Sequence, residues 1–235
     1  MNGPSPAPSS AARRRVITDS LGVGVATGLY GVSFGALGTA SGLSVLQTCV
    51  LSLLAFTGAS QFAFIGVVAA GGAPLTGALT SVLLGSRNLF YGLSLASILR
   101  LAGARRLLGA HLVIDESTAV AVAQRDDALA RLGFWWTGAS IYVLWNLSTL
   151  AGALAGTAIG DPRTYGLDAA VGAAFLALLW PRLSGALPRV VALVGAGVAL
   201  GLVPLSPAGV PIIAGGAVAV VAGLLLRDRL GRPVS

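Results

Sequence analysis

A few polar side chains interrupt a long apolar part of the chain, and these are the residues that could do chemistry. The run from Leu21 to Ser86 contains no Asp, Glu, Lys or Arg, yet Gly58, Ser60 and Gln61 lie inside it. Burying an amide without a hydrogen-bond partner costs roughly 2–7 kcal/mol. Gln61 is therefore expected either to join helices through a hydrogen bond or to contact a bound solute.

Arg87 ends the uncharged run and is followed closely by Asn88 and Tyr91. An arginine at the centre of a bilayer costs roughly 2.5–3.5 kcal/mol on insertion scales. We therefore expect Arg87 to face the protein interior opposite an anion, which could be Asp115, Glu116 or the carboxylate of a substrate. The alternative is an arginine near the membrane surface, with its head group reaching water.

Asp115 and Glu116 are adjacent carboxylates in the apolar stretch 107–123. Carboxylates inside a membrane domain are typical of proton pathways, although at a helix end on the surface they would simply be hydrated. On a continuous helix His111 would share a face with Asp115, because the two are four positions apart. That spacing makes His111 a candidate relay residue, while a lone histidine is otherwise structural.

The composition identifies the protein class. The chain is 55% hydrophobic and only 10% charged, whereas an average soluble domain is about 25% charged. The mean hydropathy is +0.87, and the apolar blocks have helical length without the alternation of a membrane barrel. We predict an all-α polytopic membrane protein with about six or seven transmembrane helices.

The basic residues indicate orientation more than nucleic-acid binding. All fifteen are Arg, which is typical of a GC-rich bacterial genome, and they cluster at the ends of apolar blocks. This is the pattern of positively charged cytoplasmic loops. We expect a disordered cytoplasmic tail at 1–17, one helical transmembrane domain at 18–226 and a basic cytoplasmic tail at 227–235. The predicted helices, apart from 43–70, cover 18–41, 74–99, 133–160, 167–180, 189–203 and 210–226.

The segment 43–70 is too long for a straight crossing. As one helix it would extend about 42 Å at 1.5 Å per residue, while the hydrocarbon core is about 30 Å thick. It could tilt, or it could break at Thr57-Gly58. A re-entrant 43–70 keeps Arg100, Arg105 and Arg106 on the cytoplasmic side. We therefore favour a broken or re-entrant segment, although 107–123 could also cross and change the count.

Glycines dominate one face of the first predicted helix. They recur at steps of three and four, which places them on one side of the helix, at Gly24, Gly28, Gly31, Gly35, Gly38 and Gly42. Such a stripe lets a neighbouring helix approach closely. A four-residue echo, Thr57 to Ser60 against 137–140, is attributed to chance.

The usual motifs of enzymes are missing from the sequence. It has no P-loop, no GxSxG and no HExxH. One histidine and one cysteine, Cys49, cannot form a metal cluster, and no cofactor is expected. Transport driven by an ion or proton gradient fits better, with Asn146 as a further polar residue in mid-span.

Five stretches of the chain, taken in order, resemble the AzlC family of branched-chain amino acid permeases. They read GLYGVSFGALGTASGLS, LSLLAFTGASQFAFIG, SRNLFYGLSLAS, DEST and GLDAAVGAAFLALLWPRL. Members often carry Asn two positions before the arginine of the third stretch, where this chain has Gly85. The resemblance implies proton-driven export of branched-chain amino acids across the bacterial cytoplasmic membrane. It also implies pairing with a small membrane subunit of the AzlD type.

Two other functions fit the same residues. A re-entrant segment beside a glycine stripe would suit a pore-like facilitator of small solutes. A non-transporting scaffold subunit would use Gln61 and Arg87 only to hold helices together.

Overall fold

The computed structural model describes residues 8–159, 176, 179–180 and 183–230, and every regular element within these ranges is a helix. The first half of the described chain contains α1 (Ser10–Leu29), α2 (Gly31–Ala40), α3 (Val45–Leu54), α4 (Ala59–Ala69), α5 (Pro74–Gly85) and α6 (Arg87–Leu99). The rest contains α7 (Ala104–His111), α8 (Asp115–Val122), α9 (Asp127–Ile159), α11 (Ala186–Leu202) and α12 (Val210–Leu230). Three helical stretches are long and apolar enough to cross a membrane: Ser10–Ala40, Pro74–Leu99 and Asp127–Ala158.

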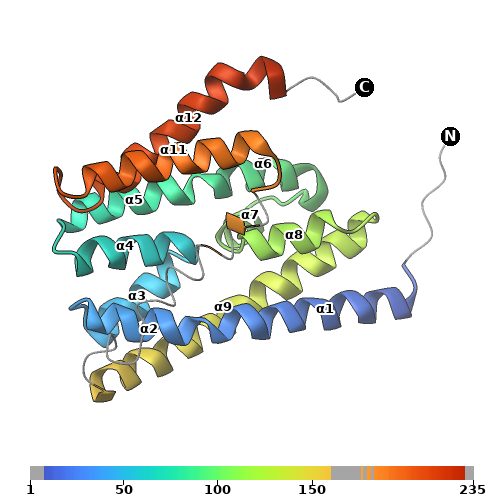
Figure 1. The fold of residues 1–235 in the computed structure, drawn as a ribbon. Coiled ribbons are helices and arrows are strands. Elements are labelled where there is room, and N and C mark those ends of the chain that lie inside the picture. The colour runs from blue at the N-terminus through green and yellow to red at the C-terminus, as the bar shows by residue number, and fades with distance from the viewer. Residues whose placement is uncertain (1–7, 160–175, 177–178, 181–182, 231–235) are drawn as a thin grey trace.

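The first span, α1 with α2, packs along α9, and the two run in the same direction (Figure 1). As predicted, the stripe allows close packing: its first four glycines face α9, while Gly38 faces Thr48 of α3 and Gly42 meets nothing within 4 Å. A Cβ added at Gly28 would lie 2.4 Å from the Cβ of Leu144, and one at Gly35 would lie 2.1 Å from the carbonyl oxygen of Thr149. The two backbones can therefore approach only because these positions lack side chains.

The segment 43–70 is broken, as the sequence predicts. Ser44 caps α3 by accepting a hydrogen bond from the backbone N–H of Gln47, and the chain leaves the helix after Leu54. Gly58, with φ +61°, precedes α4, and positive φ is the conformation that favours glycine. In Figure 1, α4 runs back towards the end of the bundle where α3 begins. Each of the two helices is about 15 Å long at 1.5 Å per residue, which is half of a membrane span.

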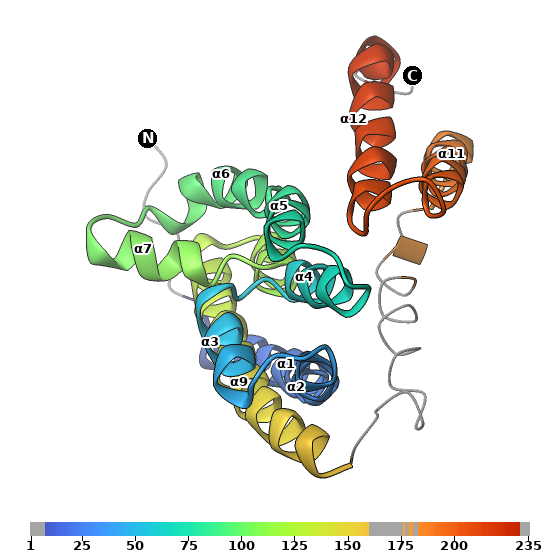
Figure 2. The ribbon, with the colours of Figure 1, turned by 90° about the vertical axis from the view of Figure 1, so that its left-hand side faces the viewer.

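Residues 107–123, which could have crossed the membrane as one helix, instead form a second discontinuous segment. It consists of α7 and α8, separated by Leu112, Val113 and Ile114. Figure 2 shows α7 side-on, while α1, α2, α4 and α5 are seen nearly end-on. His111 and Asp115 therefore do not share a helix face. The condition of a continuous helix is not met, because the chain breaks between them.

Several other boundaries differ from the prediction. Helix α1 begins at Ser10, so 10–17 is helical and does not belong to a disordered tail. It starts there because the side chain of Ser9 accepts a hydrogen bond from the backbone N–H of Ala12. Helix α12 likewise extends to Leu230, into the predicted basic tail. The helix expected over 167–180 lies, apart from residues 176, 179 and 180, outside the described residues.

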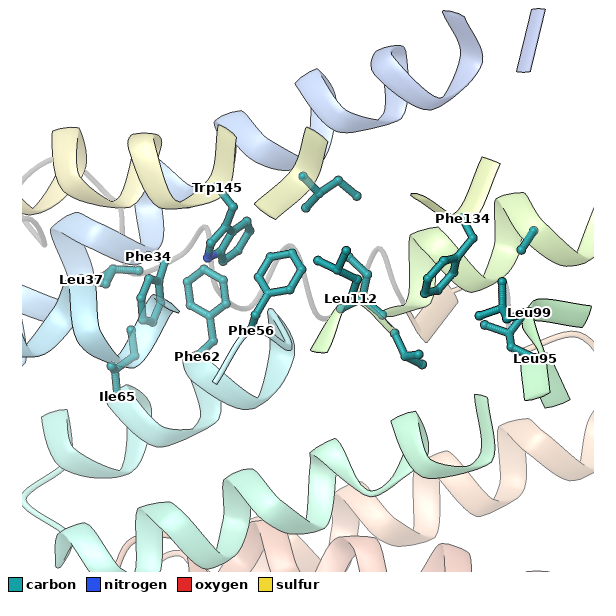
Figure 3. Close-up of a cluster of buried hydrophobic side chains, with 14 residues drawn as sticks. Phe34, Leu37, Phe56, Phe62, Ile65, Leu95, Leu99, Leu112, Phe134 and Trp145 are labelled. Carbon is teal, nitrogen blue, oxygen red and sulfur yellow. The ribbon is translucent and has the colours of Figure 1, made fainter. Parts of the chain in front are cut away.

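The buried core follows the centre of the molecule. Figure 3 shows one group of aromatic side chains, Phe34, Phe62 and Trp145, beside Phe56 and Leu112. The rings of Phe34 and Phe62 meet edge to face at 5.5 Å, and those of Phe34 and Trp145 stack at 6.1 Å. Many large apolar side chains of α5, α6, α11 and α12 are instead exposed on the outer surface. Such exposure suits contact with lipid.

Candidate functional site

An ion pair joins the second span to the second discontinuous segment. A terminal nitrogen of Arg87 lies 2.6 Å from Oδ2 of Asp115, and the two side chains are 24% and 18% exposed. The hydroxyl of Tyr91 donates a hydrogen bond to Oδ1 of the same carboxylate at 2.7 Å. Asp115 is therefore the anionic partner that the sequence required for Arg87, and Tyr91 completes the cluster.

The carboxylate of Asp115 owes its place to the start of α8. Ile114 is extended, its N–H donates to the hydroxyl of Ser117, and that hydroxyl donates to the carbonyl of Leu112 at 2.7 Å. These bonds turn the chain into α8, so that Asp115 and Glu116 occupy its first turn. Acidic side chains are favoured there because the N-terminus of a helix carries partial positive charge.

Gln61 closes the first broken segment. Its Nε2 donates hydrogen bonds to the carbonyls of Leu51 and Ser52, both at 3.3 Å, and the side chain is fully buried. These carbonyls belong to the end of α3, where that of Leu51 also accepts a hydrogen bond from the backbone N–H of Ala55 at 2.9 Å. The helix-joining interpretation therefore accounts for the donors of Gln61. Its buried Oε1 has no hydrogen-bond partner among the described residues.

Asn146 lies on α9 beside the same turn of α3. Tyr142, Asn146 and Thr149 follow one another at steps of four and three, and so share a face of α9. On that face Tyr142 donates to the carbonyl of Leu53 at 3.4 Å, and the hydroxyls of Ser52 and Thr149 lie 3.3 Å apart. Nδ2 of Asn146 donates to the carbonyl of Tyr142. Its buried Oδ1, like Oε1 of Gln61, is left without a donor in the described part of the chain.

Ser60 lies between the polar residues around Gln61 and those around Arg87. It lies in the first turn of α4, next to Gln61, and is only 2% exposed. Its carbonyl accepts a hydrogen bond from Ser81 on α5 at 2.9 Å, and a Cβ added at Gly85 would lie 3.1 Å from its hydroxyl oxygen. That hydroxyl makes no hydrogen bond within the described ranges. The start of α4 thus packs against the end of α5, two residues before Arg87.

Two predicted site residues have other neighbours. The ring of His111 lies 6.0 Å from that of Phe56 and 5.4 Å from that of Tyr142, so its recorded ring contacts are with aromatic side chains. Asn88 lines a groove of about 590 Å³ between α6 and α7. Its Oδ1 has no partner among the residues described.

Sequence reasoning named Phe62 beside the polar residues but did not single out Tyr30 and Trp145. The ring of Tyr30, at the junction of α1 and α2, lies 5.3 Å from that of Phe62 and 6.2 Å from that of Trp145. Nε1 of Trp145 is buried without an acceptor in the described structure. The position of Trp145 next to Asn146 was the only available signal, and it does not show which face of α9 is buried.

The polar side chains do not form a metal centre. Among the described residues no three His, Cys, Asp or Glu side chains gather closely enough to hold a metal ion. What the region does contain is an ion pair, several buried amide oxygens without donors and an aromatic surface. Such a set can bind a small polar molecule with an apolar part.

Comparison with known proteins agrees with this architecture. The profile of the family described as AzlC protein matches residues 22–159. The inner membrane protein YgaZ of Escherichia coli (strain K12) is 32% identical over 218 residues, covering 86% of this chain and 88% of that protein. An uncharacterized membrane protein of Archaeoglobus fulgidus is 34% identical over 196 residues, covering 83% of this chain and 84% of that protein. No solved structure matches. The family profile covers the spans and both broken segments that carry the polar cluster, and the chain is a helical membrane protein that belongs to the AzlC family.

Proposed function

We propose that this protein is a secondary transporter that exports branched-chain and similar hydrophobic amino acids across the bacterial cytoplasmic membrane. The proton gradient drives export, and a small membrane subunit of the AzlD type assists it. The family and its membrane relatives support a transport role over an enzymatic one. The substrate, the proton and the partner are implied by the resemblance of the sequence, and the chemistry of the central residues supports the first two.

The observation that carries the proposal is the Arg87–Asp115 pair at the junction of discontinuous helices. Helices that break inside a membrane protein are typical of binding sites near the bilayer midplane. Charged residues within such a domain are costly unless they are paired and used. Here the charged side chains extend from the first turns of α6 and α8, where both chain segments begin new helices.

A zwitterionic amino acid matches the unpaired groups around this centre. Nε of Arg87 is a buried donor without an acceptor in the described ranges. The hydroxyl of Ser60 lies beside Gly85, and Gly85 is two residues before Arg87 in the sequence. These donors, with the start of α4, suit the carboxylate. The amide oxygens of Gln61 and Asn146 lack donors and suit the ammonium group.

The apolar side chain of such an amino acid requires a hydrophobic surface. Phe62 lies one residue after Gln61 on α4, and its ring meets that of Trp145 edge to face at 6.2 Å. Tyr30 lies against both rings. An aliphatic chain beside these rings gains roughly 25 cal/mol for each Å² removed from water. This is the basis for selecting leucine, isoleucine and valine over polar amino acids.

The proton acts at Asp115. Arg87 and Tyr91 face its carboxylate from α6, and Glu116 follows it on α8. Protonation of Asp115 cancels its charge and weakens its hold on Arg87. The site then carries the uncompensated positive charge of Arg87, which disfavours the ammonium group of the substrate. The proton and the substrate therefore bind in turn, as export in exchange for an incoming proton requires. Glu116 is a second carboxylate that can pass the proton onward.

Efflux from cells tests the proposal. Cells expressing the chain, with and without its small partner, are preloaded with labelled leucine, isoleucine, valine and methionine. We expect efflux that requires both proteins and stops when a protonophore collapses the gradient. Arg87→Gln should abolish it. Arg100→Gln is the matched control, because Arg100 is exposed and lies 3.9 Å from Asp127. No efflux of any of the four, with both proteins present in the membrane, would contradict the proposal.

A further inference from the structure

The helix starts of the described chain recur at a constant spacing. Helix α2 begins at Gly31 and α6 at Arg87, 56 positions apart. Helix α4 begins at Ala59 and α8 at Asp115, again 56 positions apart. In both cases the order is a span with an irregular junction, a first short helix, a turn and a second short helix. One arrangement of elements therefore occurs twice.

The sequence carries the same spacing in one pair of equivalent helices. In α2 and the residue after it, Phe34, Leu37, Ala40 and Ser41 form the pattern F-x-x-L-x-x-A-S. Near the middle of α6 the pattern recurs as Phe90, Leu93, Ala96 and Ser97, each 56 positions later. Four identities at the offset that the helix starts also show link the two segments independently of the geometry.

The two copies point in opposite directions. In Figure 1 the span α1–α2 runs from the right-hand end of the bundle to the left, and the span α5–α6 runs from left to right. Helix α4 runs towards the left end, and its equivalent α8 runs towards the right end. This is the relation of an inverted repeat, in which a two-fold axis lies in the membrane plane.

Two equivalent residues, one from the turn of each copy, belong to the same buried cluster and so indicate where the two-fold axis lies. Phe56 and Leu112 are 56 positions apart, each lies in the turn of its broken segment, and both belong to one buried cluster. Figure 3 labels both side chains in the middle of that cluster. The ring of Phe56 also lies 6.0 Å from that of His111, the residue before Leu112.

Helix α9 contacts both turns. The ring of Tyr142 meets that of Phe56 edge to face at 5.1 Å. Gly138 lies one helical turn earlier, and a Cβ added there would lie 3.0 Å from the Cβ of Leu112. Both turns therefore rest on one helix outside the repeat.

We infer that residues 31–69 and 87–122 are an inverted repeat, and that the contact between Phe56 and Leu112 is the central gate of the transport pathway. The gate separates when the two copies exchange conformations, so that the centre opens to one face of the membrane and then to the other. Inverted repeats in transporters work in this way. The inference rests on the proposed transport function, and it adds two gating residues that bear no charge and bind no proton.

In this repeat only the second copy carries charged residues. Arg87, Asp115 and Glu116 have Gly31, Ala59 and Ser60 at the equivalent positions. The second copy therefore supplies both members of the ion pair. The first copy supplies a helix start without a charge, which leaves its attraction for an anion uncompensated.

Thiol labelling tests the gate without any assumption about the substrate. The background is Cys49→Ser, which removes the single cysteine. Phe56→Cys and Leu112→Cys are each treated with a charged methanethiosulfonate in right-side-out and inside-out vesicles. Phe34→Cys is the matched control, because Phe34 belongs to the same cluster, is fully buried and lies on α2 away from the turns.

We expect both turn cysteines to react from either face and the control to stay unreactive. Reaction from one face only, or no more reaction than the control, overturns the inference. Each variant gives an independent labelling result, so the test still works if one of the two proteins fails to reach the membrane.

A disulfide between the two turns supplies the functional readout. Phe56→Cys with Leu112→Cys should cross-link under copper phenanthroline, and Leu46→Cys with Leu112→Cys should not, because Leu46 lies on the exposed side of α3. The closed disulfide should stop leucine efflux, and a reductant should restore it. Efflux through the locked protein overturns the gate. Absence of leucine efflux from the unlocked protein counts against the proposed substrate, while labelling still decides the gate.

Discussion

The guanidinium of Arg87 and the carboxylate of Asp115 meet at 2.6 Å, each from the first turn of a helix that begins inside the bundle. Neither residue could occupy this place alone, because an unpaired charge in an apolar domain is costly. Since Tyr91 binds the second carboxylate oxygen, both oxygens of Asp115 are engaged. The pair therefore holds two chain segments together. It also places one negative and one positive charge where a proton and a substrate can bind them.

Replacing Asp115 should separate these two roles. Asp115→Asn leaves Arg87 without its anion and should lower stability by at most about 3 kcal/mol, since the pair is only partly buried. It should also abolish proton-dependent efflux. Adding Arg87→Gln should recover most of the melting temperature in detergent but none of the efflux. Efflux with an unchanged response to pH in Asp115→Asn would show that this carboxylate does not carry the proton.

Gln61 should matter first for the shape of the broken segment. Gln61→Leu removes two hydrogen bonds to the carbonyls of Leu51 and Ser52, each worth roughly 0.5–1.5 kcal/mol. A melting temperature lower by several degrees is expected, together with weaker efflux. Gln124→Leu is the control, because the Gln124 amide bonds to the carbonyl of Val120, four residues earlier at the end of α8, and joins no second helix. Equal melting temperatures for the two variants would contradict the role of Gln61 in joining α4 to the end of α3.

The glycine stripe predicts a sharp difference between two similar substitutions. Gly35→Ala places a methyl group 2.1 Å from a backbone oxygen of α9, so α2 and α9 must move apart. Gly22→Ala meets nothing within 4 Å and should stabilise its helix by up to about 1 kcal/mol. Membrane levels and thermal stability should fall for the first variant and hold or rise for the second. The opposite order would contradict the packing of the first span on α9.

The absence of a side chain at Gly85 should leave space for the Ser60 hydroxyl. Gly85→Ala would bring a methyl group to 3.1 Å from the Ser60 hydroxyl, forcing that hydroxyl to turn. If Ser60 binds the substrate carboxylate, the lost hydrogen bond should raise the KM for leucine by about tenfold or more. Gly92→Ala on the same span meets nothing within 4 Å and should leave KM unchanged. A KM equal to that of the parent in both variants would place the carboxylate elsewhere.

The sequence predicted those features that depend on length, cost or spacing. A segment of 43–70 cannot cross a membrane straight, so a break follows from its length, and Gly58, near its middle, is suited to positive φ. Arg87 requires an anion, and few candidates exist in the apolar part of the chain. The glycine stripe predicts a close neighbour, although the sequence does not say that the neighbour is α9.

The sequence did not predict the break at Leu112, Val113 and Ile114. No glycine or proline marks it, and the hydroxyl of Ser117 closes the turn by bonding back to Leu112 and Ile114. A serine inside an apolar stretch has several local hydrogen-bonding options, so it does not by itself indicate a break. An apolar stretch of this kind is therefore compatible with a continuous helix. For that reason His111 and Asp115 looked like neighbours. The repeat at a spacing of 56 was hidden because its clearest matches are single apolar and small residues.

Proton movement driven by leucine tests the central claim most directly. The chain and its small partner are reconstituted in liposomes with a pH-sensitive dye inside, and a leucine gradient is imposed without any proton gradient. The account predicts a change of internal pH with the parent protein, its loss in Asp115→Asn, and its retention in Arg100→Gln. Leucine movement without any pH change in the parent, or an equal pH change in Asp115→Asn, would contradict coupling through the Arg87–Asp115 pair.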